Sequence, residues 1–170
     1  MKRKMLISFT LLLIGAFSIF FIYQTLQKTN KKKEAQQYVP SFSLLDIEGD
    51  RMTEKTLKKN TPVLFLFFNT ECDLCHTELN DINSYQNDLS ECQMIFFSTQ
   101  PADSIRSFLD QISFNQTPNM FFLVDENEEL IETMGIQVMP TAIIYDRNGM
   151  LRKRFNGPVK IETLINYLSE

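Results

Sequence analysis

Two cysteines three positions apart are the residues of this chain best suited to chemistry. Cys72 and Cys75 form a Cys-x-x-Cys pair, and His76 follows directly. A strongly apolar run typical of a buried strand ends just before the pair, and a helical pattern begins at it. In that context a Cys-x-x-Cys pair indicates a dithiol that is oxidised to a disulfide and reduced again.

The expected start of the helix predicts different roles for the two thiols. Thr70 and Asp73 have the spacing of a capping box, which places Cys72 in the first helical turn. Unpaired N–H groups and the positive end of the helix dipole stabilise a thiolate there, and the thiolate is the species that attacks disulfides. Cys75 lies one turn later on the apolar stripe of the helix, close enough to attack a mixed disulfide at Cys72. We therefore expect Cys72 to be the nucleophile and Cys75 to be the resolving thiol.

Charged neighbours are expected to tune this pair. The carboxylates of Glu71 and Asp73 flank Cys72, oppose the helix dipole and disfavour a thiolate. This predicts a reducing or disulfide-exchanging couple rather than a strong oxidant. His76 is expected either to offset these charges when it is protonated or to be an exposed side chain of the first turn.

The elements that position the pair follow from the hydrophobic periodicity and the turn residues. The expected helices cover residues 75–89, 104–114, 126–134 and 161–168. The expected strands cover residues 42–45, 51–53, 62–68, 94–97, 120–124, 141–145 and 151–155, with hairpin turns at 48–50 and 146–149. This order predicts an α/β domain with a central mixed sheet flanked by helices and an N-terminal hairpin.

The first 38 residues differ in composition from the rest. A basic tail, residues 1–4, precedes nineteen uncharged and mostly apolar residues, 5–23, and a polar stretch, 24–38. At about 1.5 Å per residue, a helix of that length covers roughly 29 Å, close to the thickness of the hydrocarbon core of a bilayer. We expect an uncleaved transmembrane anchor and a polar tether before one folded domain, residues 39–170. A cleavable signal peptide is the alternative.

Charge is divided unevenly between these two parts. Residues 1–38 hold seven Lys or Arg and one Glu, a net charge of +6, whereas residues 39–170 hold ten Lys or Arg and twenty Asp or Glu, a net charge of −10. So acidic a domain is repelled by phosphate backbones, which argues against nucleic-acid binding. The domain is expected on the extracytoplasmic, periplasmic side of a single-pass membrane protein, because the short basic tail need not be translocated.

Several motifs occur in an order that carries a family resemblance. They are Val39-Pro40-Ser41-Phe42 before the first hairpin, the apolar strand into Cys72-Asp73-Leu74-Cys75, and Gly135-Ile136-Gln137-Val138-Met139-Pro140-Thr141 followed by Ile143-Ile144-Tyr145-Asp146 and Gly149. In this order the chain resembles the membrane-anchored TlpA/ResA type of thioredoxin-like proteins, within the broader redoxin or AhpC/TSA-like group. The resemblance covers nearly the whole folded part. It implies a thioredoxin-like fold, in which the helix at 126–134 and the strand before it are an insertion.

The resemblance also implies the activity. It implies a thiol-disulfide oxidoreductase that reduces or exchanges disulfides of exported proteins and needs no cofactor beyond the Cys72–Cys75 disulfide. The implied substrates are exported cysteine-containing proteins, with apocytochrome c as one example. The implied electron donor is a membrane thiol reductase of the DsbD/CcdA kind.

The same resemblance implies further site residues. The bond between Met139 and Pro140 is expected to be cis, and backbone groups of Met139 or Thr141 are expected to bind a substrate strand. Relatives have a buried carboxylate that assists proton transfer, and Glu78 is either that residue or a solvent-facing one. The chain departs from the family in having no Trp and in having Asp73-Leu74 between its cysteines, where the family commonly has Pro.

Other interpretations remain open. The sequence from Cys72 to His76 matches the attachment motif of c-type haem, and three Cys with one His are enough ligands for a metal-binding module. A thiol peroxidase of the redoxin group is a further alternative, although the Pro-x-x-x-Thr-x-x-Cys signature is absent. A redox-inactive thioredoxin-fold binding module is the last. We expect Cys92 to be a packed small side chain rather than a resolving thiol.

Overall fold

The computed structural model describes residues 17–18, 20–24 and 36–169. The chain divides into two units, residues 1–35 and residues 36–170. The described residues of the first unit are helical. Most of the expected span 5–23, the basic tail 1–4 and most of the tether lie outside the described residues. Within the described ranges, no helix has the length and apolar character needed to cross a membrane.

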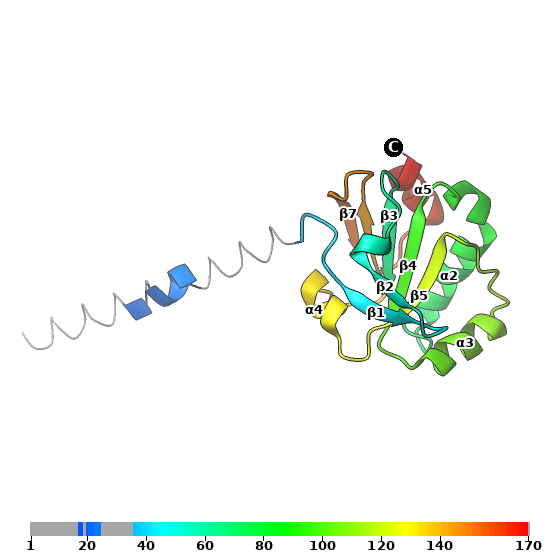
Figure 1. Ribbon diagram of the computed structural model, residues 1–170, viewed down its shortest axis with the longest axis horizontal. Coiled ribbons are helices and arrows are strands. Elements are labelled where there is room, and N and C mark those ends of the chain that lie inside the picture. Colours follow the sequence, from blue (N-terminus) through cyan, green and yellow to red (C-terminus); the bar gives the residue numbers. More distant parts are fainter. Residues whose placement is uncertain (1–16, 19, 25–35, 170) are drawn as a thin grey trace, which may run out of the picture. The chain divides into compact units, whose positions relative to one another are not determined.

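One mixed sheet forms the centre of the second unit (Figure 1). Within residues 36–169 the sheet has seven strands in the order β2-β1-β5-β4-β3-β6-β7. The strands are β1 (Ser43–Asp46), β2 (Arg51–Thr53), β3 (Val63–Phe67), β4 (Gln93–Ser98), β5 (Met120–Val124), β6 (Thr141–Tyr145) and β7 (Leu151–Asn156). Strands β3, β4 and β5 are parallel, whereas the pairs β1–β2 and β6–β7 are antiparallel hairpins. The predicted mixed sheet and both predicted hairpins are confirmed.

The helices are α2 (Asp73–Ser84), α3 (Ala102–Gln111), α4 (Glu129–Met134) and α5 (Ile161–Ser169), with short 3-10 turns η1 (Glu54–Thr56) and η2 (Gln86–Leu89). The helix predicted at 75–89 is wrong in its length, because α2 ends at Ser84, Tyr85 caps it and the chain continues as η2. The helix predicted at 126–134 begins three residues later than expected. The buried carboxylate of Asp125 accepts the N–H groups of Leu130 and Ile131, and this fixes the start of α4.

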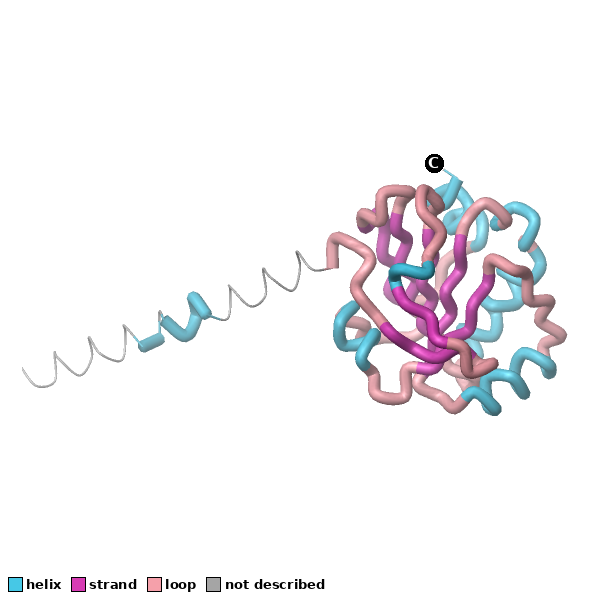
Figure 2. The backbone as a smooth tube through the Cα atoms, viewed as in Figure 1, coloured by secondary structure: helices cyan, strands magenta, loops and turns pink. Residues whose placement is uncertain are grey.

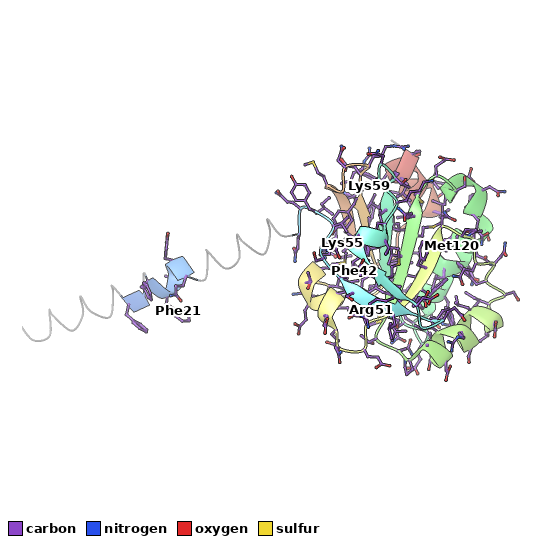
Figure 3. The ribbon with its side chains drawn as sticks, viewed as in Figure 1. Phe21, Phe42, Arg51, Lys55, Lys59 and Met120 are labelled. Carbon is purple, nitrogen blue, oxygen red and sulfur yellow. The ribbon has the colours of Figure 1, made fainter. Side chains whose placement is uncertain are left out.

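Two apolar clusters cover the two faces of the sheet. Side chains alternate along β3, so that Leu64 and Leu66 pack with α2, α3 and α5, whereas Phe65 and Phe67 pack with α4. Figures 1 and 2 show α2 and α3 on the opposite side of the sheet from α4. Phe42, labelled in Figure 3, packs edge to face on Phe65 with 5.8 Å between ring centroids. The sheet is therefore enclosed on both faces, as the continuous apolar run of β3 predicts.

Candidate active site

The chain turns sharply between β3 and α2. The N–H of Cys72 donates to the carbonyl oxygen of Asn69 at 3.2 Å, and the N–H of Glu71 donates to the Asn69 side chain at 2.8 Å. These two bonds extend the turn through Cys72, so that α2 begins at Asp73 with Cys72 as its N-cap. The predicted capping box of Thr70 and Asp73 is therefore wrong, and Cys72 lies one residue before the first turn rather than inside it.

The sulfur of Cys72 takes the capping position of the helix. Its Sγ accepts the backbone N–H of Cys75, with 3.4 Å between nitrogen and sulfur. The side chain is half-buried, and all three cysteines of the chain are free thiols. An N–H donor and the positive end of a helix dipole together stabilise negative charge on such a sulfur. The location supports the nucleophilic role expected for Cys72.

Cys75 lies one turn further along α2, on the face that packs against the sheet. Its side chain is fully buried. Burial, together with a smaller effect of the neighbouring Cys72, raises the pKa of the Cys75 thiol to about 12, although a backbone hydrogen bond at Asn69 opposes the shift. The expectation that Cys75 is the less exposed thiol is confirmed.

Glu78 follows Cys75 by three residues and occupies the same buried face of α2. It is 2% exposed, and within the described part of the chain neither carboxylate oxygen has a hydrogen-bond partner. Burial raises the pKa of Glu78 to about 8, although the backbone N–H of Val159 is near enough to lower it somewhat. Its charge in turn raises the pKa of Cys75. The alternative of a solvent-facing Glu78 is therefore wrong.

His76 is not the exposed first-turn side chain that was one expectation. Its ring is half-buried and lies on Phe108 with 4.7 Å between ring centroids. The Nε2 atom lies 2.6 Å from the carbonyl oxygen of Thr70. The N–H of the same Thr70 donates to the side-chain oxygen of Gln100 at 2.7 Å. The sequence does not predict a role for Gln100, because its contact with Thr70 spans thirty positions of the chain and no local pattern indicates it.

The two acidic neighbours of Cys72 remain at the surface. Glu71 and Asp73 are both exposed, so that solvent screens their charges. Both residues are next to Cys72 in the chain, and neither carboxylate forms a hydrogen bond with its thiol among the described residues.

The loop before β6 lies at the same edge of the sheet as the cysteines. Phe67 at the end of β3 pairs with Thr141, which brings Pro140 beside the turn that begins at Phe68. The peptide bond between Met139 and Pro140 is cis, the geometry that the resemblance implies. Pro140 and Thr141 are buried, and the Thr141 hydroxyl donates to the carbonyl of Val138 at 2.7 Å. The side chain of Met139 is exposed beside them.

Cys92 lies at the other end of the sheet from this site. It precedes β4, which runs parallel to β3, whereas Cys72 follows the far end of β3. Cys92 is 3% exposed, and its Sγ donates to the carbonyl of Leu89 at 3.1 Å. The expectation of a packed side chain is confirmed. In the part of the chain that the structure describes, no three His, Cys, Asp or Glu side chains gather as a metal site would require.

Known proteins share both the sequence pattern and this fold. The chain is 25% identical to the thiol-disulfide oxidoreductase ResA of Bacillus cereus (strain ATCC 10987 / NRS 248), over 99% of this chain and 97% of the relative. It is also 25% identical to the thiol:disulfide interchange protein DsbE of Vibrio cholerae, over 88% of this chain and 81% of that protein.

Solved structures agree with the fold. StoA from Bacillus subtilis matches with a TM-score of 0.62 at 19% identity, over 76% of this chain and 96% of that one. Mycobacterium tuberculosis dsbF matches with a TM-score of 0.67 at 15% identity, over 79% of this chain and 96% of that one. Residues 35–154 match the AhpC/TSA family, which is more than half of the chain. With its thioredoxin-like fold and its paired cysteines at the start of α2, this chain belongs to the AhpC/TSA family.

Proposed function

We propose that this protein is a thiol-disulfide oxidoreductase that reduces or exchanges disulfides of other proteins through Cys72 and Cys75. One observation carries the proposal: the half-exposed sulfur of Cys72 caps α2 and accepts the N–H of Cys75, whose own thiol is buried one turn below. The names of the relatives ResA and DsbE support the same reaction class.

The first step uses the exposed sulfur. The thiolate of Cys72 attacks one sulfur of a substrate disulfide, a new Cys72–substrate bond forms and the other substrate sulfur leaves with the electron pair and takes up a proton. Cys75 then loses its proton and attacks the sulfur of Cys72. The Cys72–Cys75 disulfide forms as the Cys72–substrate bond breaks, and the second substrate sulfur leaves with the electron pair and takes up a proton. Two electrons have then passed from the dithiol to the substrate.

The second step needs a proton acceptor, because burial raises the pKa of Cys75 to about 12 and keeps its thiol protonated near neutral pH. Glu78 suits this role. It shares the buried face of α2 with Cys75, and its carboxylate oxygens have no hydrogen-bond partner within the described residues. With a pKa of about 8, a fraction of Glu78 is ionised near neutral pH and can accept a proton. We assign Glu78 as the base that takes the proton of Cys75.

The surface around the nucleophile suits protein substrates. Leu74, between the two cysteines, is 50% exposed, and Val138 and Met139 on the Pro140 loop are 46% and 42% exposed. Exposed apolar side chains around a reactive group favour the binding of a substrate segment that is extended and has apolar residues beside its cysteine. Backbone groups of the segment Met139–Thr141 would pair with such a strand.

The location and the electron donor are also part of the proposal. The apolar run at 5–23 would anchor the chain in a membrane, and the acidic domain would face the extracytoplasmic side. Exported cysteine-containing proteins would then be the substrates, and a membrane thiol reductase of the DsbD/CcdA kind would keep the dithiol reduced. The electrons travel in the dithiol, so no other cofactor is required.

Reduction of insulin disulfides by dithiothreitol tests the proposal, with precipitation of the free B chain as the readout. The parent chain is expected to accelerate the reaction, Cys72→Ser to abolish the acceleration and Cys92→Ala to retain it. Cys92 is the matched control because it is a free thiol remote from the site. Acceleration that survives in Cys72→Ser, or no acceleration by the parent chain, contradicts the proposal.

A further inference from the structure

The two backbone polar groups of Thr70 are both held by side chains that come from elsewhere in the fold. Its N–H donates to Oε1 of Gln100 at 2.7 Å, and its carbonyl oxygen lies 2.6 Å from Nε2 of His76. Gln100 comes from the segment between β4 and α3, and His76 comes from the first turn of α2. Thr70 itself stands two residues before the nucleophile Cys72.

In the contact between His76 and the Thr70 carbonyl, the chemistry of the two groups determines which atom carries the hydrogen. A carbonyl oxygen only accepts hydrogen bonds, so the Nε2 atom of His76 must carry the hydrogen. The imidazole ring of His76 also packs against Phe108, with 4.7 Å between the ring centroids, and Phe108 is itself buried in the core at 3% exposure. The imidazole therefore has little freedom, and the carbonyl of Thr70 is fixed to a rigid donor.

The held residue belongs to the turn that presents the nucleophile. Asn69 accepts the N–H groups of Glu71 and Cys72, and the N–H of His76 donates to the carbonyl of Cys72 at 3.0 Å. Freeing Thr70 loosens the chain between Asn69 and Cys72. The contact between Cys72 Sγ and the Cys75 N–H, at 3.4 Å, depends on the conformation of that short segment.

We infer that His76 and Gln100 are positioning residues that hold Thr70 from both sides and thereby keep the sulfur of Cys72 on the N–H of Cys75. His76 acts through its hydrogen bond to the Thr70 carbonyl and its packing on Phe108, not through a charge beside the thiol. The inference rests on the proposed function in one respect, since it takes Cys72 as the reactive thiol.

Alkylation of Cys72 by iodoacetamide tests the inference without any substrate. The fully reduced full-length chain is treated between pH 6 and pH 9, and modification of Cys72 is followed by mass spectrometry. Three variants are compared with the parent: His76→Leu keeps an apolar side chain against Phe108 but has no donor, His76→Gln keeps an uncharged N–H donor, and Thr77→Val is the control. Thr77 donates its hydroxyl to the Asp73 carbonyl on the same helix, so its variant loses a comparable hydrogen bond away from the Thr70 turn.

The expected result is a rate at pH 7 about fivefold lower in His76→Leu, which is the change that corresponds to one typical hydrogen bond. His76→Gln and Thr77→Val are expected to react like the parent. Two results overturn the inference. One is that Cys72 of folded His76→Leu is alkylated at the parental rate. The other is that His76→Gln is alkylated as slowly as His76→Leu, because the charge of His76 rather than its hydrogen bond would then control the reactivity of Cys72.

A second variant covers the case in which His76→Leu does not fold. Gln100→Ala removes the other contact to Thr70 from a different element and is expected to slow the alkylation of Cys72 in the same direction. If Cys72 of Gln100→Ala is alkylated at the parental rate, Gln100 is not a positioning residue. A parent chain whose Cys72 resists alkylation throughout the pH range instead contradicts the proposed function, so the two failures are distinguishable.

Discussion

The backbone N–H of Cys75 donates to the sulfur of Cys72, with 3.4 Å between the two atoms. The bond joins the N-cap of α2 to the first turn of the same helix, so that the sulfur proposed to attack lies close to the residue proposed to resolve the mixed disulfide. A hydrogen bond to sulfur strengthens when the sulfur is charged. In the proposed reaction, this one short segment would both stabilise the thiolate of Cys72 and keep Cys75 close to it.

This order of attack predicts which variant accumulates a covalent intermediate. Cys75→Ser keeps the nucleophile but has no thiol to resolve the mixed disulfide at Cys72, so we expect it to remain linked to its substrates. Cys72→Ser is expected to trap nothing, because Cys75 is buried. Non-reducing gel electrophoresis of cells quenched with acid measures the trapped species. Equal trapping by both variants would reverse the assigned roles.

The assignment of Glu78 as a base predicts a loss of turnover in Glu78→Gln. Without a carboxylate beside it, Cys75 must lose its proton to water, and we expect insulin reduction at pH 7 to fall about tenfold. Glu132→Gln, which makes the same change at an exposed position on α4, is the control and is expected to keep full activity. Parental turnover in Glu78→Gln would show that Cys75 uses another acceptor.

The raised pKa of Glu78 predicts a separate effect on stability. This pKa is about 8 in the folded chain, above the ordinary value of 4.5 that applies when the chain is unfolded. Between these values the folded state binds the extra proton, so its free energy of unfolding falls as the pH rises through them. Glu78→Gln lacks this dependence. Its stability relative to the parent is therefore expected to increase between pH 5 and pH 8.5, on the order of 3 kcal/mol.

Urea unfolding of the reduced proteins at the two pH values measures this difference. Other titrating groups are shared by the parent and the variant, so they cancel in the comparison. A difference in free energy that stays constant with pH would mean that Glu78 titrates near its ordinary pKa.

The exposed apolar surface beside Cys72 predicts a specificity for polypeptides. Leu74→Ser is expected to raise KM for a protein disulfide about fivefold, because part of a leucine surface no longer packs on the substrate, and to leave kcat unchanged. Reaction with Ellman's reagent, a small disulfide, is expected to stay as in the parent. Leu45→Ser on β1, which changes a leucine that is 43% exposed, is the matched control. Equal KM values for the parent and Leu74→Ser would remove this surface from the binding site.

Cys92 is predicted to matter for packing and not for turnover. Its side chain is buried next to Leu89, and burial raises the pKa of its thiol to about 12. Cys92→Ala leaves a small cavity and is expected to lower the free energy of unfolding by about 1 kcal/mol, as measured by urea titration. A loss of insulin reduction in the folded variant would show a redox role that the position of Cys92 does not suggest.

Most of the fold could be predicted because its strands differ sharply from their surroundings. The run that forms β3 is apolar at every position because the strand is covered on both faces. The turn residues at Glu48-Gly49-Asp50 and around Asn148 indicate the two hairpins. The ends of helices were predicted less well. Asp125 starts α4 with a side chain that lies outside the periodic pattern, and Tyr85 divides a stripe that is continuous in the sequence.

The sequence by itself determined the candidate pair, since Cys72 and Cys75 are three residues apart where a buried strand gives way to a helix, and that spacing brings the two residues close together at the start of the helix. Only the tertiary structure decided the surroundings of the pair. Whether Glu78 is buried depends on which elements cover α2, and whether His76 is free depends on Phe108 and the Thr70 carbonyl. Burial and hydrogen bonding between distant segments arise when the chain packs, so no local pattern of residues encodes them.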